Sequence, residues 1–111
     1  MRANKTWRLE WLPPGFQLTN TSARKDAQTK ATVDSLMYED GLARFSVFLE
    51  PISDASVTET RTQLGPTVAV SRRLNTVDGE MMVTVVGEIP IGTAERIALS
   101  VRGEKNPAAQ P

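Results

Sequence analysis

The sequence predicts an α+β fold, in which a two-layer antiparallel β-sheet built from hairpins carries one C-terminal amphipathic helix packed on it. Two Asp-Gly pairs flanked by alternating apolar residues predict the hairpins. Helical periodicity occurs once, after Pro90, and predicts a single helix. Strands joined by tight turns pair antiparallel, so no parallel crossover is expected. A chain of 111 residues, 40% of them hydrophobic, suits one domain.

The first predicted element is a strand that contains both tryptophans. Trp7, Leu9 and Trp11 alternate with polar residues, which places them on one face. Two prolines and a glycine at 13–15 end this strand in a turn, after which Phe16 and Leu18 resume the alternation. Residues 22–32 are mostly small or polar, and we interpret them as an exposed loop.

The first Asp-Gly pair, Asp40-Gly41, predicts a two-residue hairpin turn. In that register Tyr38 lies opposite Ala43 and Leu36 opposite Phe45. The apolar face of this hairpin consists of Leu36, Tyr38, Phe45, Val47 and Leu49. The other face is mixed, and Phe48 is its main apolar exception.

The second Asp-Gly pair, Asp78-Gly79, predicts another hairpin, with a loop that is two residues or longer. Val68, Val70 and Leu74 share one face before it, and Met81, Val83 and Val85 share one after it. Arg72 interrupts the first of these apolar faces. Residues 55–64, which precede this hairpin, are rich in β-branched types without an apolar face and are interpreted as an edge strand or a loop.

The predicted helix follows Pro90. Its apolar stripe consists of Ala94, Ile97, Ala98 and Val101. Thr93 is the expected N-cap, and Gly103 is expected to end the helix. The helix must cover an apolar face, and the side of the sheet that carries Trp7, Phe45 and Val83 is available.

Composition excludes several classes of function. The chain has no His and no Cys, which removes imidazole and thiolate metal sites, His-based nucleophilic machinery and disulfides. Thirteen cationic side chains balance thirteen anionic ones, which argues against nucleic-acid binding. No apolar run approaches the roughly 18 residues that span a membrane. We expect no cofactor, no metal and no enzyme activity.

An enzyme would require two carboxylates that converge in one cleft with raised pKa values. The candidates are Asp40, Asp78, Glu80 and Glu88. Turn geometry accounts better for both aspartates, because Asp before Gly favours a hairpin turn.

Surface recognition remains as the main candidate function. Phe48, Arg72 and Arg73 are residue types that supply binding hot spots, and we expect them to contact a partner. Trp7 and Trp11 are expected in the core instead. Both unpaired edges of an open antiparallel sheet can also add an extended peptide.

Three sequence blocks carry a family resemblance. They are Trp-Arg-x-x-Trp-Leu-Pro-x-Gly-Phe at 7–16, Asp-Gly-Leu-x-x-Phe-Ser-Val at 40–47 and Val-Gly-Glu-Ile-Pro-x-x-Thr-Ala-x-Arg-Ile-Ala at 86–98. In this order they resemble the C-terminal domain of the RseB/MucB family of periplasmic regulators of the sigma-E (AlgU) response. The resemblance implies a domain at 7–103 preceded by linker residues at 1–6, and the stretch at 104–111, which has two prolines and no large apolar side chain, is expected to be a flexible tail.

The resemblance also implies a function. Family members bind the periplasmic region of a membrane-spanning anti-sigma factor (RseA or MucA) and shield it from regulated proteolysis, and the small domain is a main contact site. Their larger N-terminal domain resembles the lipoprotein carriers LolA and LolB and links them to lipopolysaccharide or related lipids. That domain and a signal peptide are absent from this sequence, so we expect the chain to be the C-terminal part of an exported, periplasmic protein. The alternative is a lipid- or glycolipid-sensing domain, in which Phe48 and Leu42 would line a pocket.

Overall fold

A computed structural model describes residues 5–28, 30–52, 58–76 and 79–105 of the chain. Its strands are β1 (Lys5–Leu9), β2 (Gln17–Lys25), β3 (Thr32–Glu39), β4 (Arg44–Pro51), β5 (Thr60–Leu64), β6 (Thr67–Thr76), β7 (Gly79–Gly87) and β8 (Val101–Lys105), and its helix is α1 (Ile91–Leu99). Six strands form one antiparallel sheet in the order β2-β3-β4-β7-β6-β5, while β1 and β8 form a separate antiparallel pair. The predicted fold class is confirmed.

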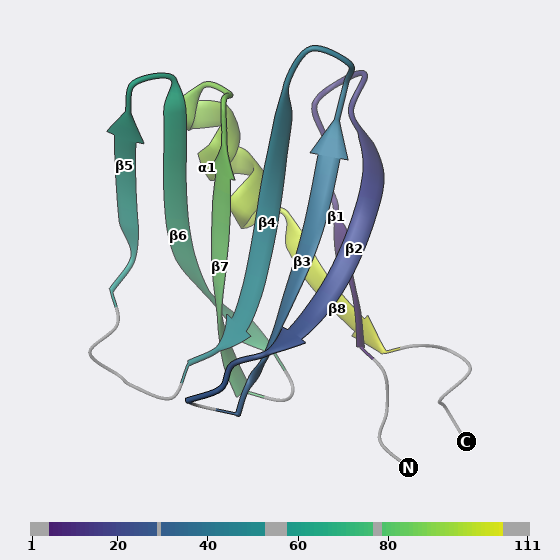
Figure 1. Ribbon diagram of the computed structural model, residues 1–111, viewed down its shortest axis with the longest axis vertical. Helices are drawn as coiled ribbons and strands as arrows, with labels where there is room; N and C mark the ends of the chain where they lie inside the picture. The colour runs from purple at the N-terminus through teal and green to yellow at the C-terminus, as the bar shows by residue number, and fades with distance from the viewer. Residues whose placement is uncertain (1–4, 29, 53–57, 77–78, 106–111) are drawn as a thin grey trace.

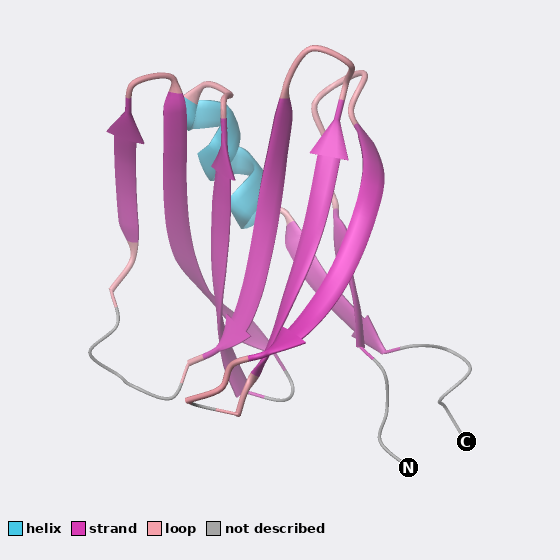
Figure 2. Ribbon diagram, in the orientation of Figure 1, coloured by secondary structure: helices cyan, strands magenta, loops and turns pink. Residues whose placement is uncertain are grey.

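The helix and the β1–β8 pair lie on the same side of the six-stranded sheet and form the second layer (Figures 1 and 2). Helix α1 packs against β6 and β7. The β1–β8 pair lies behind β2 and β3 in Figure 1. Within the described residues, no helix is long and apolar enough to cross a membrane.

The core lies between these two layers. Its most deeply buried side chains are Phe45, Val47, Leu49, Val68, Val70, Val83, Val85, Ile97 and Val101. The ring of Tyr38 stacks on that of Phe45, with 5.0 Å between their centroids. Every strand residue in this set except Val101 belongs to a face that the alternation predicted. The opposite face of the six-stranded sheet carries no layer within the described part of the chain, and we call it the open face.

The first hairpin has a longer loop than predicted. Tyr38 pairs with Phe45 and Leu36 with Val47, so residues 40–43 form a four-residue loop. The Asp40 carboxylate accepts hydrogen bonds from the backbone N–H groups of Leu42 (2.9 Å) and Ala43 (2.7 Å). These bonds stabilise a wider loop than the two-residue turn. Because the shift is two residues, every side chain keeps its predicted face.

The prediction of an exposed loop at residues 22–32 is wrong. β2 continues to Lys25 and β3 begins at Thr32, so only the residues between them connect the strands. All the side chains of β2 are exposed, because β2 is an edge strand against which the second layer does not pack closely. Such a strand lacks the apolar alternation by which buried strands are recognised.

The second hairpin and the edge strand follow the prediction where they are described. β6 pairs with β7 up to Thr76 and Gly79, and Asp78 lies outside the described residues. β5 is the other edge of the sheet, although residues 55–57 of the predicted 55–64 segment are also outside the described residues.

The helix ends earlier than predicted. It begins at Ile91 with Pro90 as its N-cap, so Thr93 lies inside it, and it ends at Leu99. Gly103 belongs to β8 and pairs with Trp7, whose ring covers it: a Cβ at position 103 would lie 2.6 Å from Trp7 Cζ3. The glycine therefore makes room for the indole. Strand pairing extends to Lys5 and Lys105, beyond the domain boundaries expected at 7 and 103.

Candidate functional site

Phe48 lies on the open face of the sheet. On β4 it is flanked by Ser35 of β3 and Thr84 of β7, and its side chain is half-buried. The hydroxyls of Ser71 and Thr84 are hydrogen bonded to each other at 3.0 Å on the same face. Phe48 is thus an accessible aromatic side chain among small polar neighbours.

Arg73 shares this face and is held in place by two glutamates. Its guanidinium Nη1 lies 3.1 Å from Glu80 Oε1, and its backbone N–H donates to Glu59 Oε2 at 3.0 Å. Ion pairs this exposed contribute about 0–1 kcal/mol. The pair with Glu80 therefore orients the cation more than it stabilises the fold.

Arg72 faces the other way, toward the helix layer. It pairs with Val83 and lines a polar depression of about 180 Å³ together with Glu59, Arg61 and Glu95. Arg61 Nη1 lies 3.3 Å from Glu95 Oε2 of α1. The structure therefore does not bring Phe48, Arg72 and Arg73 together, because consecutive residues of a strand point to opposite faces.

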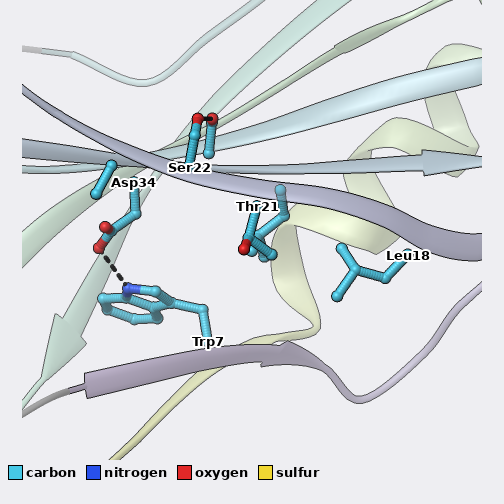
Figure 3. A pocket seen from close by; sticks show the side chains of 8 residues that line it. Trp7, Leu18, Thr21, Ser22 and Asp34 are labelled. Atoms are coloured by element: carbon cyan, nitrogen blue, oxygen red, sulfur yellow. Dashed lines mark hydrogen bonds between the residues drawn. The ribbon is translucent and has the colours of Figure 1, made fainter.

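A groove that sequence reasoning missed lies between the two layers, at the β2 edge of the sheet. Its volume is about 440 Å³ and it opens to solvent. Three strands line it, through Trp7 of β1, Leu18, Thr21, Ser22 and Ala23 of β2, and Asp34, Ser35 and Leu36 of β3 (Figure 3). Much of the lining is apolar.

Trp7 forms one wall of this groove. Its indole Nε1–H donates to Asp34 Oδ2 at 2.9 Å, which joins β1 to β3 across the layers (Figure 3). Trp7 is only half-buried, whereas the sequence placed it in the core. The available signal was its indole N–H, which needs a hydrogen-bond partner wherever the ring is covered.

Two of the candidate carboxylates lie at opposite ends of the sheet, since Asp40 precedes the start of β4 and Glu80 is at the end of β7 that pairs with Pro51. Hydrogen bonds from the backbone of Ala43 and Leu42 hold the pKa of Asp40 below its ordinary value, the opposite of what a general acid requires. Glu80 pairs with Arg73, and Asp78 lies outside the described residues. Among the described residues, no cluster of acidic side chains could hold a metal ion.

The lipid-sensing alternative required Phe48 and Leu42 to line one pocket. Leu42 is 98% exposed in the β3–β4 loop. A side chain this exposed lines no pocket, and the groove beside Trp7 is lined by other residues.

Comparison with known proteins places this arrangement in context. The model of the MucB/RseB C-terminal domain family matches residues 1–102. The sigma factor AlgU regulatory protein MucB of Pseudomonas aeruginosa is 62% identical over 98 residues, which are 88% of this chain and 31% of MucB. The sigma-E factor regulatory protein RseB of Escherichia coli K12 is 32% identical over 102 residues, which are 91% of this chain and 30% of RseB.

Solved structures share the fold of this chain. A crystal structure of MucB in complex with MucA(peri) superposes with a TM-score of 0.83 at 62% identity and covers 88% of this chain and 36% of that one. A crystal structure of MucB gives a TM-score of 0.70 at 58% identity, with 88% and 33% covered. The chain spans about a third of the length of these relatives.

Proposed function

Because the chain belongs to the MucB/RseB C-terminal domain family, we propose that it binds the periplasmic region of a membrane-spanning anti-sigma factor of the RseA or MucA type. In this role it works in the periplasm, as a regulatory module without catalytic activity, and helps to protect the anti-sigma factor from regulated proteolysis in the envelope stress response. One observation carries the proposal: MucB, 62% identical over most of this chain, was crystallised in complex with MucA(peri).

The surface chemistry of the chain supports protein recognition. Phe48 and Arg73 are accessible on the open face, and Arg72 stands over a polar depression on the other side of the sheet. Aromatic and arginine side chains dominate binding energy at protein interfaces. We therefore propose these three residues as contacts, on two separate faces.

Titration of the purified chain with the periplasmic region of MucA, followed by calorimetry, tests the function. We expect saturable binding with a Kd below about 100 μM, the range of specific but modest association. Circular dichroism of the same sample shows that the chain is folded. No heat of binding from a folded chain at that concentration contradicts the proposal.

Protection is tested separately from binding. The MucA periplasmic region is digested by the regulated protease that cleaves it, with and without this chain, and its half-life is compared. Longer survival with the chain supports a protective role. Binding without any change in half-life restricts the function to binding.

Two of the three proposed contacts are tested, Arg72 by charge reversal and Phe48 by truncation. Arg72→Glu and Phe48→Ala are each expected to weaken binding severalfold, because hot-spot side chains are lost from the interface. The matched control is Arg44→Glu, an exposed arginine at the start of β4. An unchanged Kd removes the residue concerned from the interface.

A further inference from the structure

β2 is a long edge strand whose protection is limited to a register irregularity between Leu18 and Asn20 and to the two charged residues at its end. It is nine residues long, contains no proline and pairs with β3 only, so the backbone groups along its other edge face solvent. The opposite edge strand, β5, has five residues, and its Arg61 is tied to Glu95 of α1. Long uncovered edges are templates for another strand, and proteins normally shorten, charge or cover them.

The groove lies directly beside this edge. A strand added to β2 would direct every second side chain toward the groove lined by Trp7, Leu18 and Leu36. A volume of about 440 Å³ falls within the 300–1,000 Å³ range typical of ligand sites. The groove is therefore large enough for more than one apolar side chain of an extended segment.

Charge distinguishes the two ends of the edge. Arg24 and Lys25 end β2 and Lys30 follows in the adjoining loop, against the carboxylates of Asp26 and of Asp34, which accepts a hydrogen bond from Trp7. The other end of β2 begins with Gln17 and Leu18, the latter 50% exposed. A complementary segment is apolar at one end and acidic at the other.

We propose that β2 binds an extended peptide by strand addition. Alternate apolar side chains of the peptide enter the groove beside Trp7, and its carboxylates lie near Arg24 and Lys25. The inference rests on the proposed function, since the peptide is a segment of the anti-sigma factor's periplasmic region. A second copy of the chain fits less well, because β2 itself offers only Leu18 as a large apolar side chain.

Overlapping peptides of 15 residues from the MucA periplasmic region provide the probe, and calorimetry measures their Kd for the whole 111-residue chain. In Leu18→Glu, we expect the best peptide to bind at least about tenfold more weakly, because a charge replaces an apolar wall of the groove. Leu64→Glu is the matched control, since Leu64 is an exposed leucine on the opposite edge strand, and its Kd should equal that of the wild type.

Lys25→Glu provides a second variant that does not depend on the groove. Its side chain is exposed, so the fold should survive, and we expect severalfold weaker binding that becomes indistinguishable from wild type at high salt. Circular dichroism and urea unfolding establish that each variant is folded before its Kd is interpreted.

N-methylation of the peptide backbone tests the strand itself. Peptide N–H groups of a single strand alternate between the partner strand and the other side. Methylation of one alternate set of peptide residues should therefore abolish binding. Methylation of the other set should leave the Kd within about twofold of that of the unmethylated peptide.

The outcomes separate the inference from the proposed function. If Leu18→Glu and Lys25→Glu leave the binding of MucA peptides unchanged, strand addition at β2 is overturned and the proposed function stays intact. The same holds if methylation of neither alternate set of peptide residues changes binding. Failure of every peptide and of the intact periplasmic region overturns both. A dimer of the chain that Leu18→Glu dissociates, with peptide affinity unchanged, assigns the edge to a second copy and overturns the inference.

Discussion

Asp40 shows how one side chain determines the form of a turn. Its carboxylate accepts two backbone hydrogen bonds from the loop that it begins, and Gly41 beside it has a φ of 94°, in the left-handed region that glycine adopts without strain. These bonds favour the charged carboxylate and lower its pKa. The residue is thus structural, and its contribution must depend on pH.

We expect Asp40→Ala to lower the stability of the domain at neutral pH, because two loop N–H groups lose their acceptor. Since the pKa of Asp40 is lower in the folded chain than its ordinary value of 3.8, its contribution is complete above that value and is lost as the pH falls through the lower folded pKa. Urea unfolding at pH 7 and pH 2.5 measures this: the difference between wild type and variant should shrink at the lower pH.

Glu88→Ala is the control for this prediction. Glu88 is an exposed carboxylate for which the structure shows no hydrogen bond within the described residues. Its replacement should change stability little at either pH. A difference between wild type and Asp40→Ala that is the same at both pH values would contradict the role assigned to the charge.

The apolar stripe of the helix predicts that the helix forms, but contacts with a distant strand determine where it ends. Ala94, Ile97 and Ala98 are buried against the sheet, as their spacing predicts. The helix nevertheless ends at Leu99, because Val101 enters β8 and pairs with Leu9. Strand pairing with a distant segment therefore replaces the last turn of the predicted helix.

Gly92→Ala is expected to stabilise the domain by about 0.5–1 kcal/mol. Gly92 lies in α1, a Cβ there would meet nothing within 4 Å, and alanine reduces the conformational entropy of the unfolded chain. Urea unfolding at pH 7 measures the gain. Gly65→Ala is the matched control: its Cβ also meets open space, but the φ of 59° is strained for alanine, so this variant should be less stable than wild type. Equal effects of the two substitutions would contradict the argument.

At the scale of the whole molecule, a hydrogen bond joins the β1–β8 pair to the six-stranded sheet, and contacts of Trp11 tie the segment after β1 to α1 and its C-cap. The bond from Trp7 to Asp34 spans the two layers, and the guanidinium of Arg96 lies 4.1 Å from the ring centroid of Trp11. The hydroxyl of Ser100 also donates to the carbonyl of Trp11 at 3.3 Å. These contacts position the Trp7 wall of the groove relative to β2.

We expect Trp7→Phe to destabilise the domain by about 1–3 kcal/mol, because Asp34 loses its donor and part of the ring contact is lost. A double-mutant cycle with Asp34→Ala, measured by urea unfolding, isolates the bond. The expected coupling is about 0.5–1.5 kcal/mol. A coupling near zero would show that Trp7 acts through packing alone.

The residues that face the core could be read from the sequence with little error. Alternation in 36–49 and 68–85 identified the buried face of four strands. In the first hairpin the buried face is as predicted although the pairing differs, because the loop is two residues longer and side chains alternate with a period of two. The absence of His and Cys removed whole classes of chemistry, and the three motif blocks indicated the family.

Only the tertiary structure decided the rest. β2 is exposed on both faces, so it lacks the apolar alternation of a buried strand. β8 forms because it pairs with β1, in which Trp7 lies opposite Gly103 although the two residues are far apart along the chain. The groove between β1 and β2 and the separation of Arg72 from Phe48 and Arg73 likewise result from how layers and strands meet. The periodicity of apolar residues shows which face of a helix or strand is buried. Sheet edges and grooves depend instead on contacts between elements that are distant in sequence.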